Sequence, residues 1–196
     1  MQYYIYSLVC FLLPGTVWLI WNKGMIADKA YKVRHIIWIY IYMFYGYLAV
    51  QEAAGIGSIW DLITYGKLDN SINLIPFSSE GAMTYILNII MFMPLGFLLP
   101  LIWKNFRNAK KVVLMGFLMS LAIEICQLFN IRTTDIDDLM MNTLGTLVGY
   151  CCWKVFSLIF RNAGTKCVEM KKSEPVIYMF GGILGLFLLY NWRVFN

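Results

Sequence analysis

Long runs of apolar residues, separated by short polar segments, make up most of this chain. A helix that crosses a membrane needs about 20 predominantly apolar residues. Six runs come close to this length, and no linker or low-complexity tract divides them. The pattern therefore predicts one all-α membrane domain, residues 1–196, built as a bundle of six transmembrane helices. The expected spans are Tyr4 to Trp21, Ile36 to Ala54, Met83 to Trp103, Val112 to Phe129, Leu139 to Ile159 and Val176 to Trp192.

The segment between the second and third spans contains two shorter apolar patterns. From Ile56 to Ile63, apolar residues recur at i, i+3, i+4 and i+7. This spacing predicts a short amphipathic helix near 56–64 that lies on the membrane surface. The later segment Asn73–Phe77 is mostly apolar but too short to span. Two interpretations of it stay open: it dips into the interface between helices, or it covers them.

The composition changes the picture only by excluding other classes of protein. Hydrophobic residues make up 60% of the 196 residues and charged residues 14%, and the mean hydropathy is +0.65. A soluble domain of this size has more charge and less apolar content. Disordered chains, coiled coils and disulfide scaffolds have different compositions again. Lipid is therefore the expected solvent for most of the chain.

The charge pattern predicts how the helices are oriented. The net charge of +5 does not indicate a nucleic-acid binder, because the basic residues form clusters between apolar runs. All but three of the 16 basic residues lie in or beside the loops after the first, third and fifth spans. Cytoplasmic loops are rich in Lys and Arg, so both termini and most acidic residues are expected outside a cell membrane. The three exceptions are Lys67, Arg132 and Arg193.

Three predicted spans carry a polar residue close to the outer end. These residues are Asn88, Glu124 and Asn142. With a rise of 1.5 Å per residue, each lies about 5–8 Å below the end of its helix. A polar or ionisable group at membrane depth is costly and is a functional hypothesis by default. Whether Glu124 is protonated, paired with Arg132 or coordinated to a ligand stays open.

Helical spacing gathers further polar residues around Glu124. Ser120 and Gln127 share its helix face, and Asp138 lies one turn before Asn142. If these faces meet, they form a polar pocket that opens outward and is capped by the loop 132–138. The candidate catalytic residues are Glu124 and Asp138, and the candidate ligand-binding residues are Asn73, Asn88, Gln127, Arg132, Asp135 and Asn142.

Structural roles compete with these functional ones. Polar side chains in spans often only bond neighbouring helices, and the segment Thr134–Asp137 resembles a capping box that begins a helix. Two GxxxG motifs, beginning at Gly145 and Gly181, indicate close helix packing. The single histidine, His35, is expected in a cytoplasmic loop as an interfacial residue.

Several kinds of chemistry lack any pattern in the sequence. No GxSxG, HExxH, Walker or dinucleotide motif occurs, and no Cys/His spacing or EF-hand order of ligands indicates a metal. We therefore expect neither a metal nor a cofactor. Acid–base chemistry by carboxylates stays open.

The polar motifs and their order resemble those of the VanZ family. The segments that carry the resemblance are Asn73-Leu74-Ile75-Pro76-Phe77, Asn88 through Pro94-Leu95-Gly96, Glu124-Ile125-Cys126-Gln127, Asp135-Ile136-Asp137-Asp138 and Asn142-Thr143-Leu144-Gly145. They cover about residues 70–150. The resemblance implies a multi-pass membrane protein of a Gram-positive bacterium. It also implies a role in resistance to the lipoglycopeptide teicoplanin. This resistance is expected to be stronger than resistance to vancomycin.

Two functions of different classes follow. In the first, the outward pocket binds a lipid head group, a lipid-linked cell-wall precursor or the lipoglycopeptide, without chemistry. In the second, the protein is an intramembrane enzyme that modifies an outer-leaflet lipid or precursor, with Glu124 as general acid or base. Asp138 would then orient Glu124, and Arg132 would bind an anionic group such as phosphate. The absence of a recognisable nucleophile favours the first.

Overall fold

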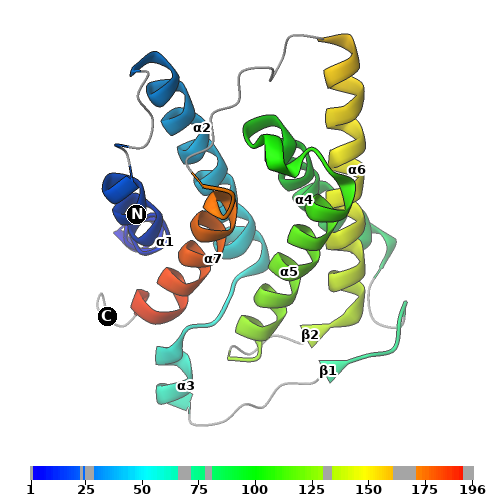
Figure 1. Cartoon of the computed structure of the whole chain (residues 1–196). Coiled ribbons are helices and arrows are strands. Elements are labelled where there is room, and N and C mark those ends of the chain that lie inside the picture. The colour runs from blue at the N-terminus through cyan, green and yellow to red at the C-terminus, as the bar shows by residue number, and fades with distance from the viewer. Residues whose placement is uncertain are drawn as a thin grey trace.

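A computed structural model of the chain describes residues 2–22, 24, 29–65, 72–77, 81–129, 134–160 and 171–191. Nearly all of the described residues are helical, which confirms the predicted all-α class. The main helices are α1 (Gln2–Asn22), α2 (Lys29–Tyr47) with its π-helical extension η2 (Leu48–Ala54), α4 (Ala82–Ile102), α5 (Ala109–Gln127), α6 (Ile136–Ile159) and α7 (Glu174–Leu189). These helices correspond to the six predicted spans (Figure 1).

Three stretches of the described chain are helical, long and apolar enough to cross a membrane. They are Gln2–Asn22, Lys32–Gln51 and Ala82–Ile102, and Glu174–Leu189 is a shorter apolar helix. Helices α5 and α6 are 19 and 24 residues long but carry more charged and polar residues. The membrane character is therefore supported, whereas the number of six spans and the outside position of both termini stay predictions.

Helices α4 and α6 are in direct backbone contact through glycines. A Cβ atom added to Gly96 would lie 1.9 Å from the carbonyl oxygen of Thr146, and one added to Gly149 would lie 1.9 Å from that of Met93. Gly145 faces the Ile89 carbonyl oxygen at 2.3 Å in the same way. The predicted role of the first GxxxG motif in helix packing is confirmed, and α5 packs on the same pair of helices.

The two ends of the chain pack against each other. Helix α7 lies along α1, where a Cβ added to Gly185 would lie 2.3 Å from the Cys10 carbonyl oxygen. Gly181 of the second GxxxG motif is less constrained, because its added Cβ would be 3.5 Å from Pro14. Buried side chains of α1, α2, α4, α5 and α7 form one continuous apolar core.

The predicted amphipathic helix is present but begins later than expected. Helix α3 spans Ile59–Tyr65, and Ile56 is buried before it starts. Asp61 sets this start, because its carboxylate accepts hydrogen bonds from the backbone N–H and the hydroxyl of Ser58. The predicted helix near 56–64 is therefore confirmed, with its beginning at Ile59, and its position on the membrane surface stays a prediction.

Two short strands lie at the same end of the molecule as α3. Strand β1 (Ile72–Asn73) pairs in parallel with β2 (Thr134–Asp135), with Asn73 opposite Asp135. The sequence pattern does not predict this pair. It joins the segment before α4 to the start of α6 (Figure 1).

Candidate functional site

Carboxyl and amide side chains gather where the N-terminal ends of α4 and α6 meet the C-terminal end of α5. We call this group the carboxylate cluster. Its carboxylates belong to Glu124 of α5, Asp135 of β2, and Asp137 and Asp138 of the first turn of α6. Its amides belong to Asn73, Asn88 and Asn142.

Asp135 connects three elements of the cluster. Its Oδ1 accepts from the backbone N–H of Asp137 at 2.9 Å, so it is the N-cap of α6. Its Oδ2 accepts from the Asn73 amide at 3.1 Å across the β1–β2 pair. The prediction that this segment begins α6 is confirmed, but the N-cap is Asp135 and not the Thr134 of a capping box. The bond to Asn73 adds a side-chain contact to the β1–β2 pair.

Glu124 is buried close to the start of α6. Its Oε2 accepts from the backbone N–H of Asp135 at 3.2 Å, and its backbone carbonyl oxygen accepts from the Thr134 hydroxyl at 3.3 Å. The C-terminal turn of α5 is thereby connected to β2. Glu124 and Asp138, the two candidate catalytic residues, both lie in this cluster.

The two aspartates of the first turn of α6 have different partners. Asp138 accepts a hydrogen bond from the Asn88 amide of α4. Asp137 is fully buried and accepts from the Phe77 backbone N–H at 2.8 and 3.0 Å and from the Tyr85 hydroxyl at 2.9 Å. From the sequence, Asp137 was expected only to help begin α6. Its partners Phe77 and Tyr85 could not be inferred from spacing, because they lie 60 and 52 residues away.

Asn142 lies inside the interface between α5 and α6. Its amide nitrogen donates to the Ser120 hydroxyl at 3.0 Å, and its side chain is only 3% exposed. Within the described residues, the amide oxygen of Asn142 has no hydrogen-bond partner. A buried polar atom without a partner costs free energy, so this oxygen is a candidate contact for a ligand.

Two further site residues were predicted, Gln127 and Arg132. The amide nitrogen of Gln127 donates to the Ala54 carbonyl oxygen of η2 at 2.9 Å, so this bond is with another helix. Arg132 lies outside the described residues. In the described part of the chain, no group of three or more His, Cys, Asp or Glu side chains is arranged to hold a metal ion.

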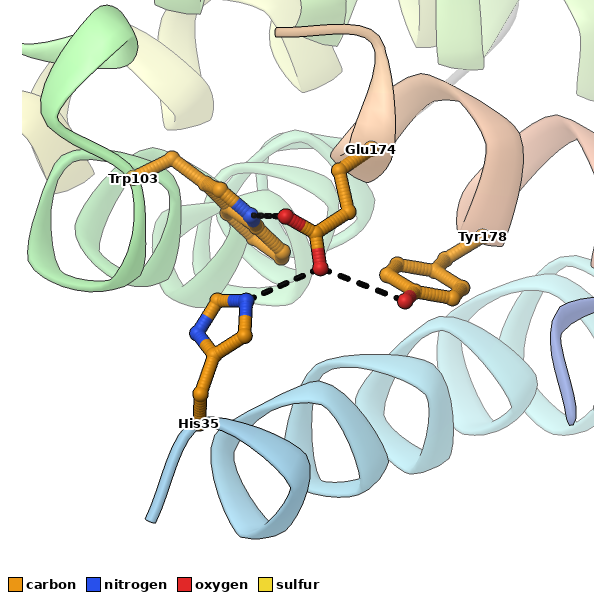
Figure 2. Close-up of polar contacts among 4 residues, drawn as sticks. All are labelled: His35, Trp103, Glu174 and Tyr178. Carbon is orange, nitrogen blue, oxygen red and sulfur yellow. Dashed lines mark hydrogen bonds and ion pairs between the residues drawn. The ribbon is translucent and has the colours of Figure 1, made fainter. Parts of the chain in front are cut away.

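A second buried polar group lies at the opposite end of α4. We call it the histidine cluster, and its members are His35 of α2, Trp103 at the end of α4, and Glu174 and Tyr178 of α7. Figure 2 shows their side chains converging on the Glu174 carboxylate. His35 Nε2 lies 2.8 Å from Oε1, the Tyr178 hydroxyl 3.2 Å from the same oxygen, and the Trp103 indole N–H donates to Oε2 at 3.1 Å.

Aromatic rings close the histidine cluster against water. Trp103 packs edge-on against His35 and against Tyr42, with ring centroids 6.3 and 4.9 Å apart. The expectation that His35 lies in a loop as an interfacial residue was wrong. It lies within α2 and is buried, because Glu174 of α7 supplies its partner 139 residues later in the chain. No periodicity links residues so far apart, and the only signals are one histidine and one acid beside apolar runs.

Comparison with known proteins identifies the family. The sequence model of the family described as VanZ/LLP1 matches residues 5–158, which include the whole carboxylate cluster but not α7. The chain is also 36% identical over 134 residues to Protein VanZ from Enterococcus faecium, covering 67% of this chain and 77% of that protein. No solved structure matches this chain significantly. Because the family model matches most of the chain and this relative is 36% identical, the chain belongs to the VanZ family.

Proposed function

We propose that this protein lowers the susceptibility of a Gram-positive cell to teicoplanin-type lipoglycopeptides. In this proposal the carboxylate cluster faces outward from the cell membrane. It binds a lipid head group, a lipid-linked cell-wall precursor or the drug itself, and no bond is made or broken. Membership of the VanZ family supports the link to teicoplanin.

The buried, unpartnered amide oxygen of Asn142 is the observation that carries the proposal. Asn142 lies one helical turn after Asp138, and its partner Ser120 lies one turn before Glu124. The open acceptor therefore belongs to the interface on which both carboxyl groups lie. A ligand with N–H or O–H donors would satisfy this oxygen and the carboxylates together, and would gain binding free energy from the match.

The chain also offers a route for amphiphilic ligands. The cluster lies at one end of α4, a helix apolar enough to cross a membrane. A molecule that carries an acyl chain concentrates in the lipid leaflet, because each buried methylene gains about 0.8 kcal/mol. Such a ligand would approach the cluster from the lipid side with its polar part already at the correct depth.

The test compares wild type with Glu124→Gln in a susceptible Gram-positive host. Susceptibility to teicoplanin and vancomycin is measured side by side at equal membrane expression, checked by blotting. We expect selective protection against teicoplanin from the wild type and its loss in the variant. Asp61→Asn is the matched control, because it makes the same acid-to-amide change at α3, outside the cluster, and it should keep protection.

A second readout separates binding from chemistry. Lipids and cell-wall precursors are profiled in cells with and without the wild-type protein. An unchanged profile together with Glu124-dependent protection supports a binding protein. A new lipid or precursor species that requires Glu124 would instead make the protein an enzyme with Glu124 as general acid or base. Full protection by a stable Glu124→Ala protein would sink both hypotheses.

A further inference from the structure

The segment from β1 to Phe77 exposes large apolar side chains next to the carboxylate cluster. Ile72 is 57% exposed, Leu74 69%, Ile75 68% and Phe77 63%. Most of their surface is therefore not covered within the described part of the chain, although the Phe77 ring contacts Tyr85 of α4. A contiguous apolar patch on a protein surface marks an interaction site.

The backbone of this segment is fixed at both ends by side chains. At its start, Asn73 pairs with Asp135 through the β1–β2 ladder and through its amide nitrogen, while its Oδ1 accepts from the Ile75 backbone N–H at 3.1 Å. At its end, the Phe77 N–H donates to the buried Asp137 carboxylate. The backbone that carries the exposed apolar side chains is therefore held in place at both ends.

The backbone of Phe77 adopts an unfavourable conformation. Its φ of 61° lies in the left-handed region, which a bulky residue adopts only where its surroundings hold it there. The hold comes from Asp137 and from the ring of Tyr85, which packs edge-on against Phe77 with centroids 6.0 Å apart. The chain thus uses a fully buried carboxylate to keep an apolar side chain exposed.

The exposed patch continues onto the outer face of α4. Met83, Ile86, Leu87 and Ile90 of this helix are all at least half exposed, and α4 is a candidate membrane span. Tyr85 joins the two surfaces, because it belongs to α4 and contacts Phe77. The patch is thus an extension of a surface whose expected neighbour is lipid.

We propose that residues Ile72–Phe77 form a rigid apolar wedge that inserts into the lipid leaflet at this end of the bundle. Its partner is the boundary between acyl chains and head groups, where short apolar segments gain free energy by burial. Asp137 holds the wedge and also belongs to the carboxylate cluster, so insertion places that cluster at head-group depth. The proposal does not depend on which ligand the cluster binds.

The experiment measures the depth of single labels in the full-length protein. The five native cysteines are replaced by serine or alanine, and a nitroxide is attached to Leu74→Cys or, separately, to Ile75→Cys. The protein is reconstituted into phosphatidylglycerol–phosphatidylcholine vesicles. Collisions with oxygen, which concentrates in hydrocarbon, are compared with collisions with a water-soluble nickel chelate. Met83→Cys on the exposed face of α4 is the lipid control, and the exposed Asn108→Cys before α5 is the water control.

The wedge predicts that labels at 74 and 75 favour oxygen over nickel, like the label at 83. A preference for nickel, like that at 108, overturns the proposal. Dipolar broadening between labels with exclusion of both reagents also overturns it, because a second copy of the chain would then cover the patch.

A further pair of variants tests the hold on Phe77. With the label at 74, Asp137→Ala should make the nitroxide more mobile. It should also raise the frequency of its collisions with the nickel reagent relative to oxygen. Tyr85→Phe should change the label less, since it keeps the hydrogen bond between Phe77 and Asp137. An unchanged label in a folded Asp137→Ala protein would show that the wedge is not held in this way.

Discussion

The carboxylate cluster and the histidine cluster lie at opposite ends of α4 and differ in burial and in hydrogen bonding. About 15 residues of helix separate Asn88 from Trp103, which corresponds to about 22 Å. In the histidine cluster, three side-chain groups converge on one carboxylate, and every member is buried. In the carboxylate cluster, four carboxyl groups share backbone and amide donors, and Asn73, Asn88 and Asp138 are only partly buried.

The difference shows how hydrogen-bond balance separates a structural role from a ligand role. A buried carboxylate with several donors is stable as it is and gains nothing from a ligand. A group with an unpartnered acceptor, such as the Asn142 amide oxygen, gains free energy when a ligand supplies a hydrogen-bond donor. We therefore expect changes in the histidine cluster to lower stability, and changes at Glu124 to lower function first.

The largest expected effect is that of Glu174→Leu. It leaves His35, Trp103 and Tyr178 without their buried partner, and breaking such a pair typically costs about 3–5 kcal/mol. Denaturant unfolding in detergent should show this loss in the free energy of unfolding. Glu174→Gln should lose less, because an acceptor remains. Wild-type stability in Glu174→Leu would mean that apolar packing alone holds α7, and the contrast between the two clusters would fail.

A glycine change at the contact between α4 and α6 should disturb the carboxylate cluster and leave the histidine cluster unchanged. Gly149→Ala places a Cβ against the Met93 carbonyl oxygen of α4, so α6 must move away at a cost of about 1–3 kcal/mol. The bond between Asn88 and Asp138, which joins the same two helices, should weaken, and teicoplanin protection should fall. Thermal unfolding and susceptibility are measured together. Gly181→Ala is the control, since its Cβ makes an ordinary contact with Pro14; equal losses in both variants would contradict the assignment.

The smallest effect is expected for Asp135→Ala. It removes the N-cap of α6 and the tie to Asn73, and a lost cap typically costs about 1 kcal/mol. The free energy of unfolding should fall by that order. Asp135→Asn should retain most of it, because Asn is an equally good N-cap. If Asp135→Asn were as damaging as Asp135→Ala, the charge of Asp135 rather than its capping bond would be what matters.

Local patterns predicted the elements better than their partners. The apolar runs located the six long helices of the described chain, and the small residues from Gly145 to Gly149 indicated a close helix contact, which α6 makes with α4. The start of α6 near Asp135 was recognisable because a capping bond joins residues only two apart. Each of these features depends on neighbours in sequence, so each can be inferred from spacing.

The partners of polar side chains required the fold. Gln127 lies on the Glu124 face of α5, yet its amide bonds η2 instead. Asp137 was expected at most to begin α6, but it holds Phe77 from 60 residues away. Helical periodicity specifies which face a residue occupies, but it does not specify which element packs on that face.

By itself, the sequence determined that this is an all-α, apolar chain with its polar motifs near the ends of helices, because lipid solvation and helix geometry act on local stretches. Only the tertiary structure decided that His35 is buried against Glu174, that β1 pairs with β2, and that Leu74 and Phe77 are exposed. These features depend on contacts between distant segments, where a polar group finds its partner only after the helices have packed.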